Sequence, residues 1–333
     1  MRLSRRFWIA LTICLGACSD HSGEAILSDY EARLSRTLDL NFESTAIAAA
    51  PRKPRAEALQ LELQNSDIGT LDFLALTGCE LQITIGKRNS SLGKLAPPSQ
   101  RLLLDLEFLR HAPACIAHLE SKADQQELVS LLEQSQILKQ QQLARQIHNA
   151  TLAGPEWHQF WKPQKIPVGY PSDTTSDQVL QALDAITAMA DNWLRGDYVA
   201  DNQMFEMHLN TLRSGDGGVI LSATQTGHEF FSRWNTTLGE HTQQHACSPE
   251  SRRTILETVI AKYFAGSVQQ WLAPIMSRAD NIQQASNQLE NLLSQASSAE
   301  YNRWRQQRDD YIQAMKSLTV AHVKTLKRVI NPC

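Results

Sequence analysis

The chain has 333 residues, of which 42% are hydrophobic and 20% are charged, and its 32 Lys and Arg against 35 Asp and Glu give a net charge of −3. This length allows one or two domains with a sizeable core. The mildly acidic balance argues against nucleic-acid binding through bulk electrostatics, and no tandem repeat or low-complexity tract is detectable.

The N-terminal segment 1–17 has the pattern of an export signal. Three arginines precede an apolar run of eleven residues, 7–17, which is shorter than the roughly 20 residues of a membrane-spanning helix. The sequence Leu15-Gly16-Ala17-Cys18 resembles the bacterial lipobox, in which the cysteine is lipidated and the chain is cut before it. This resemblance implies a lipoprotein signal peptide over residues 1–17 and a lipid on Cys18. A plain secretion signal with a chance cysteine is the alternative.

The residues after Cys18 bear on where a lipid anchor would hold the protein. In many Gram-negative lipoproteins, an aspartate directly after the lipidated cysteine retains the protein in the inner membrane. Here that position is Ser19, and the aspartate follows one residue later. We therefore expect anchoring at the outer membrane, on its periplasmic face. Removal of residues 1–17 takes away three arginines and no acidic residue, so the net charge would change from −3 to −6.

Apolar residues recur at steps of three and four along most of the chain, which is the pattern of helices with one buried face. The pattern is clearest in 27–38, 179–193, 282–296 and 301–322. Strand-like alternation is confined to Leu59-Gln60-Leu61-Glu62-Leu63. The sequence therefore predicts an all-α fold, a multi-helix bundle.

The clearest break in this pattern is the stretch 162–175, which contains three prolines and one glycine. It separates an N-terminal helical half, 18–161, from a C-terminal helical half, 176–333. Neither half has a linker long enough to swing freely, so we expect the two halves to pack as one unit.

Four cysteines remain besides the candidate lipid site: Cys79, Cys115, Cys247 and Cys333. An exported compartment is oxidising, and an even count favours two intrachain disulfides. Three pairings are possible, and we favour Cys79–Cys115 with Cys247–Cys333 because each pair stays within one half. Loop entropy would then stabilise the fold by about 4 and 4.5 kcal/mol. Four free thiols are the alternative.

Motifs for known chemistry are scarce. The chain has no G-x-S-x-G elbow, P-loop or dinucleotide fingerprint, and the His-Glu pair within 227–231 lacks the second histidine of a zinc protease. His241 and His245 could share a helix face near Cys247, but they supply only two firm ligands if that cysteine is oxidised. We therefore expect no cofactor and no metal.

A polar stretch, 77–101, connects two apolar helices and is the first candidate site. It carries the cationic and hydrogen-bonding residues Arg88, Asn89, Ser90 and Lys94. Such a loop could bind an anionic or glycan ligand. The alternative is a capped helix turn that a disulfide holds in place.

An aromatic stretch, 148–163, is the second candidate site. Trp157, His158 and Trp161 crowd a short helix after Gly154-Pro155. They could form a partner-binding surface. The alternative is an aromatic plug that packs the two halves together.

Four stretches resemble a family of Gram-negative lipoproteins that carry a domain of unknown function. They are LDFLALTGCELQITIGKRNSSLGKLAPPSQRLLLDLEFLRHAPAC (71–115), NATLAGPEWHQFW (149–161), SVQQWLAP (267–274) and the C-terminal 321–333. The resemblance covers most of the mature chain. It implies an envelope lipoprotein with two paired cysteine sets, and it implies no reaction.

Two functional hypotheses follow. The favoured one is a non-catalytic binding or scaffold module, anchored by its lipid, whose partners are envelope proteins or glycan and not nucleic acid. The alternative is an envelope enzyme that acts on peptidoglycan or lipid. A deep cleft with a buried pair of Glu, Asp or His would favour the enzyme, and a flat or shallow groove lined by Trp157, Trp161 and the 87–94 loop would favour binding.

Overall fold

The computed structural model describes residues 22–43, 49–64, 70–122, 124–171, 173–244 and 250–330. Helices occur throughout these ranges and no strand occurs within them. The predicted all-α, multi-helix fold is therefore confirmed for this part of the chain. None of its helices is long and apolar enough to cross a membrane.

The helices lie on both sides of the Pro-rich connection. Before it are α1 (Gly23–Leu38), α2 (Ala56–Leu59), α3 (Thr70–Ala75), α4 (Leu81–Asn89), α5 (Ser91–Lys94), α6 (Pro98–Glu120), α7 (Gln126–Ala150) and α8 (Pro155–Phe160). After it are α9 (Asp173–Leu194), α10 (Asn202–Arg213), α11 (Gly217–Gln244), α12 (Glu250–Val259), the π-helix η1 (Ile260–Val268), α13 (Gln269–Leu292), the 3₁₀ helix η2 (Ser294–Ala296) and α14 (Ala299–Ile330).

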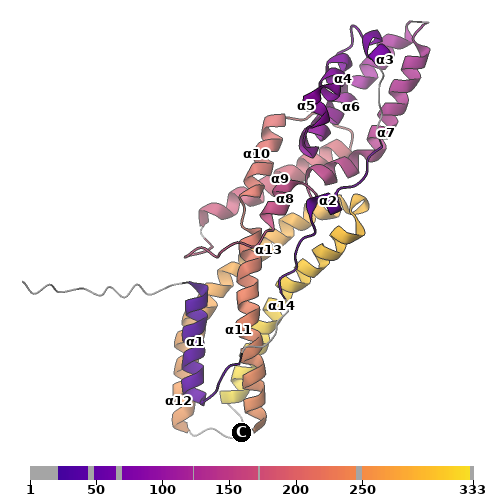
Figure 1. Cartoon of the computed structure of the whole chain (residues 1–333). Helices are drawn as coiled ribbons and strands as arrows, with labels where there is room; N and C mark the ends of the chain where they lie inside the picture. Colours follow the sequence, from indigo (N-terminus) through magenta and orange to yellow (C-terminus); the bar gives the residue numbers. More distant parts are fainter. Residues whose placement is uncertain are drawn as a thin grey trace, which may run out of the picture.

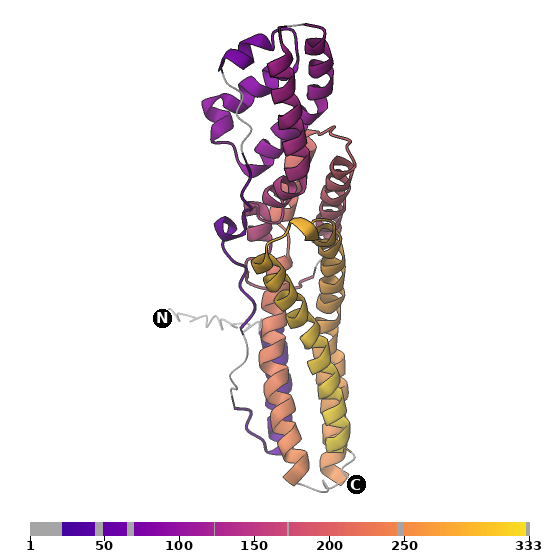
Figure 2. The ribbon, with the colours of Figure 1, turned by 90° about the vertical axis from the view of Figure 1, so that its right-hand side faces the viewer.

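The molecule is long, and three hydrophobic cores follow one another along its length (Figures 1 and 2). The upper end in Figure 1 contains α3 to α7, the middle contains α8 to α10, and the lower end contains α1, α12 and the last turns of α11 and α14. Each core forms because the apolar stripes of neighbouring helices face one another.

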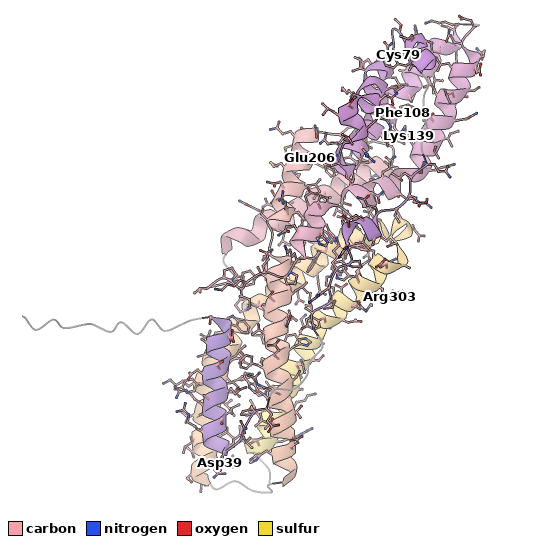
Figure 3. The ribbon with its side chains drawn as sticks, viewed as in Figure 1. Asp39, Cys79, Phe108, Lys139, Glu206 and Arg303 are labelled. Atoms are coloured by element: carbon pink, nitrogen blue, oxygen red, sulfur yellow. A yellow bond between two sulfur atoms is a disulfide. The ribbon has the colours of Figure 1, made fainter. Side chains whose placement is uncertain are left out.

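The upper core is built from a continuous stretch of sequence, Leu76 to Leu132. Within it Cys79 and Cys115 form a disulfide with a Cα–Cα distance of 5.4 Å, as predicted. The bond joins the turn before α4 to α6, near the upper end of the molecule (Figure 3). Cys247 and Cys333, the other predicted pair, lie outside the described residues.

The middle core draws on both sides of the Pro-rich connection. It contains Leu106 and Ile147 from before the connection and Ile186 and Ile282 from after it. These residues are at most 1% exposed. The two stretches of sequence therefore share one packed interior at this level of the molecule.

In the lower core, α1, α11 and α14 run in one direction and the continuous path α12–η1–α13 returns in the other (Figure 1). α1 packs against α11, α12 and η1. It begins at mid-length, where Ser22 Oγ caps it by accepting from Ala25 N at 3.3 Å, and it ends at the lower tip beside Asp39 (Figure 3).

Candidate functional site

One face of α7 carries a stripe of polar residues where an apolar stripe would be expected. Lys139, Gln142, Gln146 and Asn149 follow at steps of three, four and three. Residues at these steps lie above one another on a helix. They are between 4% and 7% exposed, so this polar stripe is buried. Buried polar groups need hydrogen-bond partners, and the partners here come from two places, the extended segment after α2 and Asp105 of α6.

The extended segment after α2 supplies the first set of partners. The amide of Asn149 accepts from Leu61 N and donates to Leu61 O, both at 2.8 Å. The amide of Gln142 accepts from Gln64 N at 2.6 Å and donates to Gln64 O at 3.2 Å. The two side chains thus satisfy backbone groups as a neighbouring strand would. This explains why the strand-like alternation around Leu61 does not produce a sheet.

The buried carboxylate of Asp105 on α6 supplies the second set. Its Oδ1 accepts from Arg88 of α4 at 2.5 Å and from Lys139 Nζ at 2.6 Å, and its Oδ2 accepts from Gln146 Nε2 at 2.5 Å. Asp105 is 2% exposed, and a buried charge is tolerated only when it is paired in this way. Figure 3 shows Lys139 beside Phe108, and its Nζ lies 5.1 Å from the centre of that ring.

A cavity of about 200 Å³ lies between these groups. It is lined by Gln60, Leu61, Leu63, Gln64, Arg88, Pro98, Arg101, Leu102, Asp105, Lys139, Gln142, Gln146 and Asn149. We call it the polar pocket. The lining includes three basic side chains and one carboxylate, so it carries a net positive charge.

One side-chain atom of a lining residue lacks a hydrogen-bond partner and is itself enclosed by protein. Gln146 Oε1 is buried and has no hydrogen bond within the described part of the chain. Its amide orientation is fixed, because Nε2 donates to Asp105. A buried acceptor without a donor costs about 1–3 kcal/mol, and because this oxygen is enclosed, the cost falls on the fold.

Of the four residues singled out in the first predicted site, Arg88 alone lines this pocket. Ser90 instead caps α5, where its Oγ accepts from Gly93 N at 3.0 Å and donates to Lys87 O at 2.7 Å. A Cβ on Gly93 would lie 2.2 Å from the same carbonyl, so this turn requires glycine. Asn89, Ser90 and Lys94 are exposed. The capped, disulfide-held turn therefore describes most of this stretch.

The carbonyl of Lys94 nevertheless helps to place a pocket residue. It accepts a hydrogen bond of 2.9 Å from Arg101 Nη2, and Arg101 lines the pocket from the start of α6. Arg88 and Arg101 therefore approach the same cavity from α4 and α6. Sequence spacing alone did not reveal this, because the two residues are on different helices.

The second predicted site is not a surface. Trp157 and Trp161 are 0% and 1% exposed and pack edge to face 6.1 Å apart in the middle core. The binding-surface interpretation of these two tryptophans is wrong, and the aromatic-plug alternative describes them. His158 is partly exposed, and burial lowers its pKa from the ordinary value.

No metal site is found in the part of the chain that the structure describes, where no three His, Cys, Asp or Glu side chains gather. His241 is buried in α11, whereas His245 and Cys247 lie outside the described residues. Cys18, the predicted lipid site, also lies outside them.

The fold and the pocket together define an elongated helical protein with a small, positively charged polar pocket near one end. The chain matches a family described as "Protein of unknown function (DUF3080)" over residues 27–333. It belongs to that family, which fits the resemblance seen in the sequence. The searches of curated proteins and of solved structures found no match.

Proposed function

We propose that this protein is a lipid-anchored binding module of the cell envelope and that its polar pocket binds an anionic sugar. The lipobox-like residues 15–18 support the anchor, with Cys18 as the lipidated residue, and Ser19 supports placement at the periplasmic face of the outer membrane. The pocket supports the binding role. Its partners are envelope glycan or glycan-bearing proteins, and not nucleic acid.

The observation that carries the ligand class is the gathering of three basic side chains and one carboxylate around the cavity. Arg88 and Arg101 suit a carboxylate or phosphate, because guanidinium donors match the geometry of these anions. The exposed amide of Gln60, which also lines the pocket, can hydrogen-bond to a hydroxyl. A sugar that bears an acidic group supplies both features in one small molecule.

The size of the pocket limits how much of a ligand it encloses. Ligand pockets usually measure about 300–1,000 Å³, and this one measures about 200 Å³. It therefore holds a single sugar unit or the acidic end of a longer glycan, and the rest of such a ligand would lie outside.

The chemistry of the pocket favours binding over hydrolysis. Both oxygens of Asp105 already accept hydrogen bonds from protein donors. Neither a second carboxylate nor a histidine is present among the described lining residues. Glycan hydrolysis by acid–base catalysis uses two carboxyl groups, so the alternative of an envelope enzyme receives no support from this pocket.

The ligand class can be tested by calorimetric titration of the purified, detergent-solubilised protein with N-acetylmuramic acid. The neutral sugar N-acetylglucosamine is the matched ligand control. We expect the acidic sugar to bind. Arg101→Gln should weaken the affinity for this sugar about 10- to 100-fold, which is the range for one charge-assisted hydrogen bond. Arg110→Gln, an exposed arginine of α6 outside the pocket lining, should leave binding unchanged. Equal affinity for both sugars, or equal effects of both variants, would refute the proposal.

The anchor is tested separately by metabolic labelling with a palmitate analogue. The wild-type protein should take up the label, and Cys18→Ser should not. Label on the Cys18→Ser variant would show that the lipid is elsewhere. Absence of label on the wild type would refute the proposed lipid anchor and would have no bearing on the proposed ligand of the polar pocket.

A further inference from the structure

A second hollow lies at mid-length, where α1 begins. It has a volume of about 460 Å³. Gly23 and Ile26 line it from α1, Pro167 and Tyr170 from the Pro-rich connection, and Trp271 and Pro274 from α13. None of its described lining residues is charged. We call this hollow the waist groove.

The indole of Trp271 forms the wall of the groove against the start of α1. A Cβ on Gly23 would lie 2.2 Å from Trp271 Cζ2, so glycine is needed for the ring to lie this close. Trp271 is partly exposed. The other tryptophans that the structure describes, Trp157, Trp161, Trp193, Trp234 and Trp304, are at most 2% exposed.

The backbone of the η1–α13 path, which also carries Trp271, is unusual beside the groove. Gly266 and Ser267 line it from the π-helix η1. π-Helical turns are rare and often occur at functional sites. The groove therefore combines an uncharged aromatic wall with a local departure from regular helix geometry.

The position of the groove along the chain indicates what covers it. Gly23 is five residues after Cys18, and five extended residues span at most about 17 Å. A lipid on Cys18 would hold the groove within that distance of the membrane. Trp and Tyr side chains are enriched at the membrane–water interface, because their rings are apolar and one end is polar. An uncharged lining also avoids the cost of removing ions from water.

We infer that the waist groove rests on the bilayer and contacts phospholipid of the leaflet that holds the anchor. This inference rests on the proposed lipid at Cys18. Because α1 begins at mid-length (Figure 1), the long molecule would touch the membrane with its side and not with an end. The polar pocket, which α4, α6 and α7 form toward the upper end, would then be displaced along the membrane from the contact point.

Trp271 provides the test, because it is the accessible fluorophore among the described tryptophans. The mature lipidated protein is reconstituted into vesicles of phosphatidylethanolamine and phosphatidylglycerol whose acyl chains are brominated. We expect bromine to quench up to about one sixth of the emission, since the mature chain has six tryptophans. Trp271→Phe should abolish the quenched fraction. Equal quenching of wild type and Trp271→Phe, or no quenching of either, would overturn the inference.

A pair of valine variants tests the surroundings of the groove. Val168 is 75% exposed and stands between the lining residues Pro167 and Gly169, whereas Val320 is 52% exposed on α14. Val168→Asp should reduce the quenched fraction, because a charge there opposes contact with lipid, and Val320→Asp should not. Equal behaviour of the two variants would contradict the inference and favour a groove covered by another protein.

A third arrangement separates this inference from the proposed anchor. Cys18→Ser protein with a hexahistidine tag in place of the lipid is attached to vesicles that contain a nickel-chelating lipid and brominated phospholipid. Quenching of Trp271 in this arrangement supports the groove contact even if palmitate labelling shows that Cys18 carries no lipid. Suppose instead that the wild-type protein takes up palmitate at Cys18 but the tagged Cys18→Ser protein shows no quenching. That result refutes the groove contact and leaves the proposed anchor standing.

Discussion

Asp105 and Glu290 are both buried carboxylates held by basic side chains, but their surroundings differ. Glu290 is 1% exposed and accepts from Arg308 at 2.8 and 2.9 Å and from Tyr301 Oη at 2.6 Å. The Arg308 guanidinium lies 4.5 Å from the ring centre of Trp161. Aromatic rings therefore seal this ion pair, whereas Asp105 stands beside a cavity.

This difference separates a structural ion pair from a candidate binding site. Around Glu290, Arg308 and Tyr301 are 0% exposed, and the partly exposed Arg305 also pairs with the carboxylate at 3.1 Å. In the polar pocket, a ligand could approach Arg88 and Arg101 through existing space. Similar ion-pair chemistry thus has different consequences, and the deciding quantity is the free volume beside the charges.

The largest expected effect comes from removing the sealed carboxylate. Glu290→Leu leaves Arg308 buried without its main partner, so we expect the free energy of unfolding to fall by about 3–5 kcal/mol. Urea denaturation measures this loss. Glu300→Leu, which replaces an exposed glutamate of α14, should change stability by no more than about 0.5 kcal/mol. A similar loss in both variants would show that the buried ion pair of Glu290 contributes no more to stability than an exposed glutamate does.

The second prediction tests whether the lower core excludes water from a polar side chain as the surroundings of Glu290 do. His322 is 0% exposed, accepts from Tyr30 Oη at Nε2 and donates from Nδ1 to Asn235 Oδ1, both at 3.0 Å. Burial lowers its pKa to about 3. The unfolded state therefore binds the extra proton, and stability is complete above pH 6.5 and falls as the pH drops toward 3.

Between pH 6.5 and 5, this one histidine should cost about 2 kcal/mol of stability. Denaturation at pH 7.5 and 5.0 should show a smaller pH effect in His322→Gln than in the wild type. His148, whose pKa burial lowers to about 4, remains in both proteins and contributes equally. An unchanged pH effect in His322→Gln would contradict the prediction.

A smaller loss is expected for the carboxylate of the pocket. Asp105→Asn removes the charge that Arg88 and Lys139 share, but the adjacent cavity admits water to both. We therefore expect a loss of about 1–3 kcal/mol, less than for Glu290→Leu. Thermal denaturation compares the two, with the exposed Asp124→Asn as control. A larger loss for Asp105→Asn than for Glu290→Leu would reverse the comparison.

The smallest effect concerns the extended segment beside the pocket. Gln142→Ala removes both side-chain hydrogen bonds to Gln64, at a cost of about 1 kcal/mol. Hydrogen exchange of the Gln64 amide should become faster, while exchange in α6 stays the same. The neighbouring exposed Gln141→Ala is the control. Unchanged exchange at Gln64 would show that another contact holds this segment.

The sequence was informative where the signal is local. The spacing of Tyr301, Trp304, Tyr311 and Met315 predicted a buried helix face, and all four are buried in α14. The Cys79–Cys115 bond followed from an even cysteine count and from placing each pair within one half. Regular helix spacing and cysteine pairing need little knowledge of tertiary contacts.

The polar pocket could not be predicted in the same way. The stripe from Lys139 to Asn149 has helical spacing, but polar residues at such spacing usually face solvent. What buries them is the segment around Leu61, which meets Asn149 across 88 residues of sequence. For Trp157 and Trp161, the sequence showed aromatic clustering but not which face of α8 the core would cover.

The packing of α1 has a consequence for the order in which the protein can assemble. α1 is synthesised before its partners α11 and α12, which end at Gln244 and Val259. At roughly 5–20 residues per second, α1 waits about 10–40 s for them. During that time its apolar face, with Leu27, Tyr30 and Leu34, has no native cover. The upper core, which needs only residues 76–132, can form much earlier. α1 is therefore made before the helices that cover it, and a holding factor that shields its apolar face would act in this interval.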